Sequence, residues 1–149
     1  MTTKLEQILE HAIAKERAAY ELYDHAALLA KDAIAKALLM SLAGEERKHE
    51  ELLSQASADA MITQKVPHVQ DLKVTDFLEE RPLKPGASFQ EILIFAAQRE
   101  KESAQTYEAL SRQATEKATQ SLFDQLAAQE WSHKRKLEEL YDDVALREN

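Results

Sequence analysis

The chain contains two Glu-x-x-His sequences, Glu46 with His49 and Glu130 with His133, which lie 84 positions apart. Residues three apart on a helix share one face, a single turn from each other. A carboxylate and an imidazole in this arrangement can bind a divalent cation. One such pair on a charged helix is usually a solvated surface feature, but two pairs in matching surroundings indicate a binding site.

A lone glutamate precedes each pair at the same offset. Glu16 has Ala12 and Tyr23 on its own helix face, so its carboxylate lies in the middle of an apolar stripe. Glu100 has the same position in the second half of the chain, with Tyr107 as the counterpart of Tyr23. We therefore expect the lone glutamates, like those of the two pairs, to point into the protein core.

Four buried carboxylates without partners would cost several kcal/mol per charge, and no lysine or arginine shares their stripe. Two divalent cations would supply the missing positive charge. Oxygen and nitrogen ligands suit iron or manganese, with zinc possible. The pattern thus predicts a dinuclear metal site with the ligands Glu16, Glu46, His49, Glu100, Glu130 and His133. The other charges beside Glu46 are interpreted as a solvated face: Glu45, Arg47, Lys48, Glu50 and Glu51.

The elements that position these residues are helical. Ala, Leu, Glu, Gln and Lys dominate the 149 residues, which include only 2 glycines and 3 prolines. We expect a single domain over 1–149, with helical hairpins at about 4–57 and about 89–145. The connection at about 58–87 holds every proline, and we expect at most a short ordered piece at 74–80.

Each hairpin begins with a capping box, Thr3 with Glu6 and Ser88 with Glu91, and each has a break near its middle. These signals predict helices at about 4–30, 33–57, 89–113 and 117–143. Glu16 and Glu46 both lie 15 residues from the first turn, so both are about 22 Å from it and face each other at one level. The fold class is therefore all-α, a four-helix bundle of two repeated hairpins.

The segments KERAAYELY, EERKHEELL, REKESAQTY and QEWSHKRKL resemble those of rubrerythrin-type members of the ferritin-like superfamily. The resemblance implies a ferritin-like bundle with a long crossover between helices 2 and 3. It also implies two iron ions on the six predicted ligands, with the hydroxyls of Tyr23 and Tyr107 near them. Proteins of this type react a diferrous centre with hydrogen peroxide or dioxygen.

The sequence departs from that family in two respects. It contains no cysteine, whereas rubrerythrins usually carry a cysteine-ligated rubredoxin domain, so we expect electrons from a separate donor such as a rubredoxin-like protein. Rubrerythrin peroxidases also have a further glutamate one turn past the third-helix ligand, where this chain has Ser103. The neighbouring Glu102 is expected to point elsewhere on the helix.

Charge and hydropathy exclude other classes of function. The net charge of −8 and the absence of a basic stripe argue against nucleic acid as a partner. No apolar run approaches the roughly 20 residues of a membrane span, and no secretory h-region is present, so we expect no membrane partner and a cytoplasmic location. We also expect a homo-oligomer, with a dimer favoured.

Three functions remain open from the sequence. The preferred one is an oxidoreductase that reduces hydrogen peroxide or dioxygen at a di-iron centre. The alternatives are a ferroxidase or iron-handling protein that feeds an iron store, and a structural bundle with a redox-silent metal site. Tyr20 and Trp131 are interpreted as packing residues, and His11, His25 and His68 as exposed or local.

Overall fold

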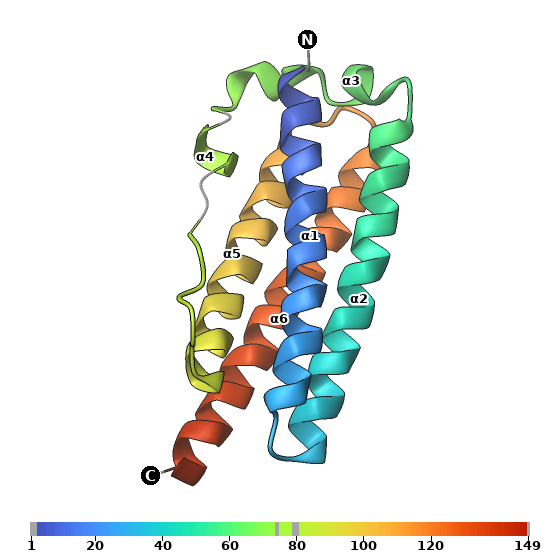
Figure 1. Ribbon diagram of the computed structural model, residues 1–149. Helices are drawn as coiled ribbons and strands as arrows, with labels where there is room; N and C mark the ends of the chain where they lie inside the picture. The colour runs from blue at the N-terminus through green and yellow to red at the C-terminus, as the bar shows by residue number, and fades with distance from the viewer. Residues whose placement is uncertain (1–2, 74, 79–80, 149) are drawn as a thin grey trace.

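A computed structural model describes the chain except for residues 1–2, 74, 79–80 and 149. Figure 1 shows an elongated bundle of four long helices: α1 (Lys4–Leu29), α2 (Ala33–Ala58), α5 (Phe89–Gln113) and α6 (Lys117–Glu148). The all-α prediction is confirmed, and the described residues contain no strand. The first three helices match the expected bounds within one residue, whereas α6 continues 5 residues beyond the expected end at 143. None of the described helices combines the length and apolar character that crossing a membrane would require.

Local sequence sets where the long helices start. Both predicted capping boxes are confirmed: the side chain of Thr3 accepts from the backbone N–H of Glu6, and that of Ser88 from Glu91, with the reciprocal bonds also present. The carboxylate of Asp32 caps α2 by accepting from the backbone N–H of Ala35, without a reciprocal bond. Because each cap satisfies amides that would otherwise lack partners, these starts need no tertiary contact to be defined.

The connection between the hairpins is more ordered than the sequence indicated. Besides α4 (Thr75–Leu78), which falls within the predicted piece at 74–80, it forms α3 (Ile62–Lys65) and the 3₁₀ helix η1 (Pro67–Asp71). The expectation of at most one short ordered piece was therefore wrong. The physical cause of the additional order is apolar burial, since side chains on both extra elements and between them pack into the end of the bundle: Ile62, Val66 and Val69.

The rest of the connection follows the predicted pattern in part. Phe77 packs against the bundle, whereas Leu78 is 36% exposed. Leu72 lies beside the start of α1, where its carbonyl accepts a hydrogen bond from Lys4 Nζ. Ala87 packs at the other end of the bundle, so the described parts of the connection lie at both ends (Figure 1). Residues 74, 79 and 80 of the predicted piece are outside the described residues.

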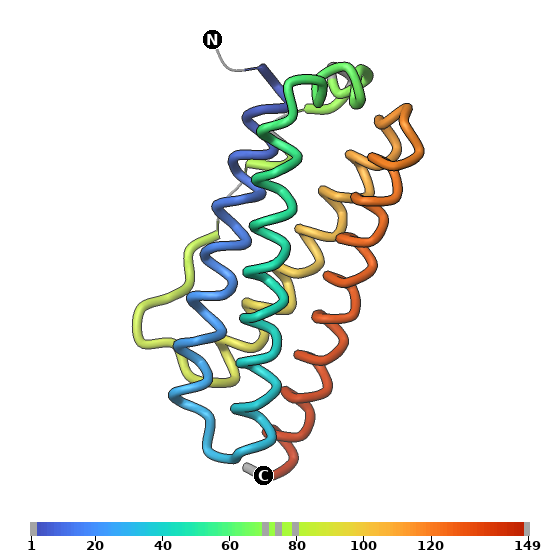
Figure 2. The backbone as a smooth tube through the Cα atoms, turned by 90° about the vertical axis from the view of Figure 1, so that its right-hand side faces the viewer, coloured from blue at the N-terminus to red at the C-terminus, as the bar shows by residue number. Residues whose placement is uncertain are grey.

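The interior has two apolar layers with polar residues between them. The first layer includes Leu9, Leu53 and Tyr107, and the second includes Tyr23 and Leu93. Positions related by the 84-residue repeat, such as Leu9 and Leu93, therefore lie in opposite layers. The hairpins are thus related by an approximate two-fold axis perpendicular to the bundle, and Figure 2 shows the two hairpins side by side.

The ends of the hairpins are joined by individual bonds. At one end, the backbone N–H of Thr115 in the α5–α6 turn donates to the carbonyl of Lys65 in α3, 3.1 Å away. At the other end, Arg147 near the end of α6 pairs with Asp32 in the α1–α2 turn at 2.5 Å. The first contact ties the second hairpin to the connection, and the second ties the two hairpins to each other.

The apolar layers give a direct test of the fold. Leu126 and Leu146 are leucines on the same helix, 2% and 75% exposed. We expect Leu126→Ala to lower the free energy of unfolding by about 2–5 kcal/mol, because it removes buried methyl groups and leaves a cavity. Leu146→Ala should change it by less than about 0.5 kcal/mol. Urea denaturation of the metal-free protein measures both; equal losses would contradict the assigned interior.

Candidate metal centre

The six predicted ligands meet between the two apolar layers. Each comes from a long helix and is at most 2% exposed. They form two overlapping groups whose ligand atoms lie within 4.8 Å of one another: Glu16, Glu46, His49 and Glu130 in one, and Glu46, Glu100, Glu130 and His133 in the other. Glu46 and Glu130 are common to both groups, so their carboxylates lie between two potential metal positions.

The histidines reach across from one hairpin to the other. Nδ1 of His49 lies 2.6 Å from Glu130 Oε1, and Nδ1 of His133 lies 2.6 Å from Glu46 Oε1. The two imidazole rings stack nearly parallel, with centroids 5.7 Å apart and an interplanar angle of 11°. Nδ1 is therefore the ring nitrogen that each histidine presents to the carboxylate cluster.

The outer nitrogens of the same rings have partners of their own. Nε2 of His49 bonds to the side-chain oxygen of Gln129, and Nε2 of His133 bonds to a carboxylate oxygen of Glu45. An oxygen acceptor at Nε2 holds a proton on that nitrogen, so the proton that a metal ion displaces is the one on Nδ1. Both partners thus orient their histidine so that Nδ1 can bind a metal.

The sequence interpretation of Glu45 as part of the solvated face was wrong in this respect. Its side chain is 39% exposed, but the carboxylate turns toward His133. Gln129, whose side chain is exposed, was not predicted to contact the site. A signal was present, because each residue directly precedes a predicted ligand and the two occupy equivalent positions of the repeat. Only the packing of α2 against α6 shows that they face a ring on the other hairpin.

The two tyrosines also cross between hairpins. Tyr23 Oη–H donates to Glu100, and Tyr107 Oη–H donates to Glu16. Burial, reinforced by the charges of neighbouring glutamates, raises the pKa of both phenols well above 10. Both tyrosines therefore stay protonated and hold one oxygen of each lone glutamate.

The cluster fits divalent cations. The Oε2 atoms of Glu16, Glu46 and Glu100 are buried without a hydrogen-bond partner among the described residues. The ion pairs described for these carboxylates are all with histidine: Glu16 with His49, Glu46 with His49 and His133, and Glu100 with His133. These Oε2 atoms lie 3.4–3.6 Å from a histidine Nδ1 without a hydrogen bond to it, so a cation placed among them would be stabilised.

Without metal, protons compensate part of this charge. Burial disfavours ionisation of Glu46, but hydrogen bonds with His133 and His49 outweigh it and lower its pKa to about 2. Burial likewise lowers the pKa of His133, but its bonds with Glu100 and Glu46 raise it to about 10. Burial and the charges of neighbouring carboxylates raise the pKa values of Glu100 and Glu130. The metal-free site therefore holds protons that metal ions would displace.

The position that differs from rubrerythrin peroxidases lies beside the cluster. Ser103 is half-buried and lines a cavity of about 10 Å³ together with Tyr107. Glu102 points away, as expected, and forms ion pairs with Lys15 at 3.5 Å and Arg81 at 3.7 Å. Glu102 thus does not take the place of the additional carboxylate.

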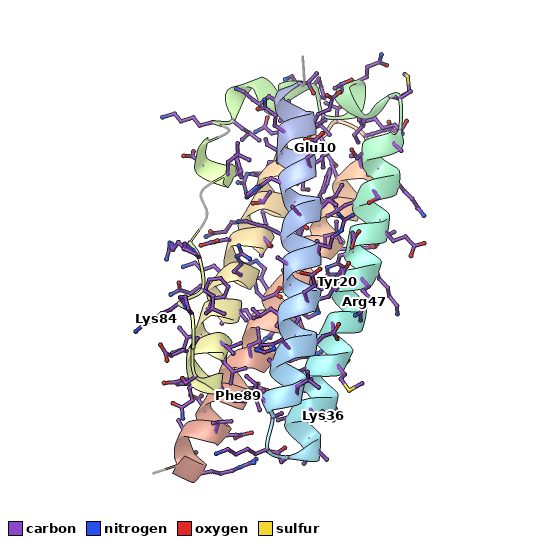
Figure 3. All side chains as sticks on the ribbon, viewed as in Figure 1. Glu10, Tyr20, Lys36, Arg47, Lys84 and Phe89 are labelled. Carbon is purple, nitrogen blue, oxygen red and sulfur yellow. The ribbon has the colours of Figure 1, made fainter. Side chains whose placement is uncertain are left out.

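Other residues singled out in the sequence lie outside the cluster. The guanidinium of Arg47 stacks over the ring of Tyr20 at 4.7 Å, on the outer side of α1 and α2 (Figure 3). Tyr20 therefore packs as expected. His25 and His68 are exposed, whereas His11 is half-buried and lines the same small cavity as Ser103.

Residues 91–149 match the protein-family model described as Rubrerythrin. This range covers most of α5 and all of α6. The match supports a rubrerythrin-type, ferritin-like protein, and with it the resemblance found in the sequence is confirmed. The first hairpin lies outside the match, and its likeness to the second rests on the repeat and on the paired contacts. No curated protein and no solved structure was found to match the chain.

The pKa values make the stability of the metal-free protein depend on pH. The pKa of His133 rises from an ordinary value of 6.5 to about 10 on folding. Between these two pH values the folded state therefore holds a proton that the unfolded state lacks. The stabilisation is complete below about pH 6.5 and is lost as the pH rises through 10. We expect a loss on the order of 1 kcal/mol per pH unit between pH 7 and 9.

Thermal unfolding of chelator-treated protein at pH 7, 8 and 9 measures this effect. The unfolding temperature should fall across the series, and metal-loaded protein should show a smaller fall because its histidine is already deprotonated. His133→Gln, which removes the titrating ring, serves as the control and should flatten the dependence. An unfolding temperature that rises with pH in the metal-free wild type would contradict the raised pKa of His133.

Proposed function

We propose that this rubrerythrin-type chain is a di-iron oxidoreductase that reduces hydrogen peroxide or dioxygen, with peroxide preferred. The family match and the buried glutamate–histidine cluster support a di-iron protein. The observation that carries the proposal is the set of three orphaned carboxylate oxygens, on Glu16, Glu46 and Glu100, inside two overlapping ligand groups. Oxygen and nitrogen donors of this kind suit iron, and manganese or zinc remain chemically possible.

The roles of the ligands follow from the two groups. Glu16 and His49 belong to one metal position alone, and Glu100 and His133 to the other. The carboxylates of Glu46 and Glu130, which belong to both groups, would help to hold both ions. Four carboxylates then balance two divalent charges, so the loaded site is neutral at the bundle centre.

The surrounding residues keep this arrangement rigid. Tyr23 and Tyr107 each hold one oxygen of a terminal glutamate, and the partners at Nε2 fix both imidazoles. The apolar layers on both sides exclude bulk water from the ligands. A pair of ferrous ions would supply the two electrons that, with two protons, reduce one hydrogen peroxide to two waters. The protein's contribution is a site that needs little rearrangement to hold both ions.

Turnover also requires a source of electrons. These 149 residues contain no cysteine, so they cannot build a rubredoxin centre. We therefore propose that a separate donor, such as a rubredoxin-like protein, returns the iron to the ferrous state. The homo-oligomer, with a dimer favoured, also stays a prediction, which light scattering of the purified protein tests.

Metal binding is tested by removing one glutamate and one histidine of the cluster. We expect wild-type protein, loaded anaerobically, to bind two ferrous ions per chain. Glu46→Ala with His49→Ala should abolish tight binding at both positions, because Glu46 serves both. The matched control is Glu51→Ala with His25→Ala, which removes the same residue types from exposed positions and should leave two ions bound. Metal analysis after desalting decides the result, and unchanged content in the first variant would refute the site.

The oxidation step is tested by mixing the diferrous protein with peroxide or with air. We expect ferric absorbance in the near ultraviolet to rise faster with peroxide, with one peroxide consumed per two irons oxidised. Catalytic peroxide consumption should then require an added rubredoxin and its reductase. If neither oxidant produces ferric absorbance, a redox-silent site such as zinc is the better description, and the proposed activity fails.

Ser103 favours a second candidate function, ferroxidase activity, since it replaces a carboxylate associated with peroxidase activity. A ferroxidase would use dioxygen in preference to peroxide, release the ferric ions and accept further ferrous iron. Repeated iron additions, followed by iron analysis and light scattering, separate the two functions. Iron that accumulates far beyond two ions per chain in a large assembly would favour the iron-handling alternative.

A further inference from the structure

The cluster follows the approximate two-fold axis in nearly every contact. The four glutamates, the two histidines and the two tyrosines each have a counterpart of the same type 84 residues away. The cross-hairpin bonds of His49 and His133 to Glu130 and Glu46 have the same length, 2.6 Å. The two potential metal positions therefore have ligands of the same types, and charged groups around this set can make the positions unequal.

One pair of contacting residues breaks the symmetry in charge. Glu45 accepts from Nε2 of His133, whereas its counterpart Gln129 accepts from Nε2 of His49. The two side chains can have the same hydrogen-bonding role, but the first is a carboxylate and the second a neutral amide. The fold thus builds a carboxylate–histidine pair at one metal position and an amide–histidine pair at the other.

This difference acts directly on a metal ligand. A carboxylate that accepts from the outer nitrogen of an imidazole draws its proton and makes the inner nitrogen a stronger donor to a cation. A hydrogen bond to an ionised acceptor is also stronger than one to a neutral acceptor. The negative charge of Glu45 further stabilises a cation on the other side of the ring, whereas Gln129 has no such charge.

We propose that Glu45 makes the metal position of Glu100 and His133 the tighter of the two, so that it fills before the position of Glu16 and His49. Glu45 and Gln129 are positioning residues that act through the histidines and touch no metal. The inference rests on the proposed metal site but not on the oxidant that the site uses.

The test exchanges the two residues. Co²⁺ is added at one equivalent per chain to metal-free protein, and anomalous scattering from crystals measures its occupancy at each position. In the wild type we expect the His133 position to hold about ten times more cobalt than the His49 position, in line with the usual effect of such partners on metal affinity. In the double variant Glu45→Gln with Gln129→Glu, the preference should reverse.

Single variants separate charge from hydrogen bonding. Glu45→Gln keeps an acceptor for His133 but removes the charge, so it should bring the two occupancies close to equality. Gln129→Glu should do the same by strengthening the other position. In solution, titration with Co²⁺ should show the first binding step weakened about tenfold by Glu45→Gln. Two separate steps alone are not diagnostic, because repulsion between two cations would produce them in a symmetrical site.

Each outcome has a distinct meaning. A higher cobalt occupancy at the position of Glu100 and His133, which reverses in the double variant, supports the inference. Preferential filling at His49, or an order that the exchange leaves unchanged, overturns the inference while leaving the dinuclear site intact. If the wild type binds no cobalt and no iron, both this inference and the proposed function are wrong.

Discussion

The structure depends on the burial of four carboxylates in the middle of an otherwise apolar bundle. Each is at most 2% exposed, and the ion pairs described for them are with histidine alone. Such a cluster is stable only if protons or cations offset its charge. Protons do so in the metal-free protein, as the raised pKa of His133 indicates, and divalent metals would do so more completely because they supply four charges at two points.

The architecture around the cluster follows from this constraint. Two apolar layers enclose it from above and below, and each layer contributes one tyrosine that reaches the polar residues between them. Tyr23 and Tyr107 each bind a glutamate of the other hairpin. The same interactions that satisfy the polar layer therefore hold the hairpins together, so the site and the fold stabilise each other.

The ligands of the two metal positions are related by the approximate two-fold axis, but the residues around them are not all alike. Such a difference around a symmetrical set of ligands can make the two positions unequal. Substitutions among the ligands would disturb both positions, because Glu46 and Glu130 are shared. A change in the acceptor at Nε2 affects one position only. Glu45 and Gln129 are such acceptors, and their side chains are partly exposed, so water screens the charge of Glu45 in part.

The sequence by itself determined the helices, their starts and the inward glutamates and histidines, because helical periodicity and capping are local and the repeat shows each feature twice. It could not determine the cross-hairpin pairing, since the partners of Tyr23 and Tyr107 depend on how the hairpins pack. It also missed Glu45 and Gln129, because their contacts with a histidine depend on how α2 and α6 pack. The order in 62–71 was missed for a related reason: the apolar side chains of that segment are buried only against a completed bundle.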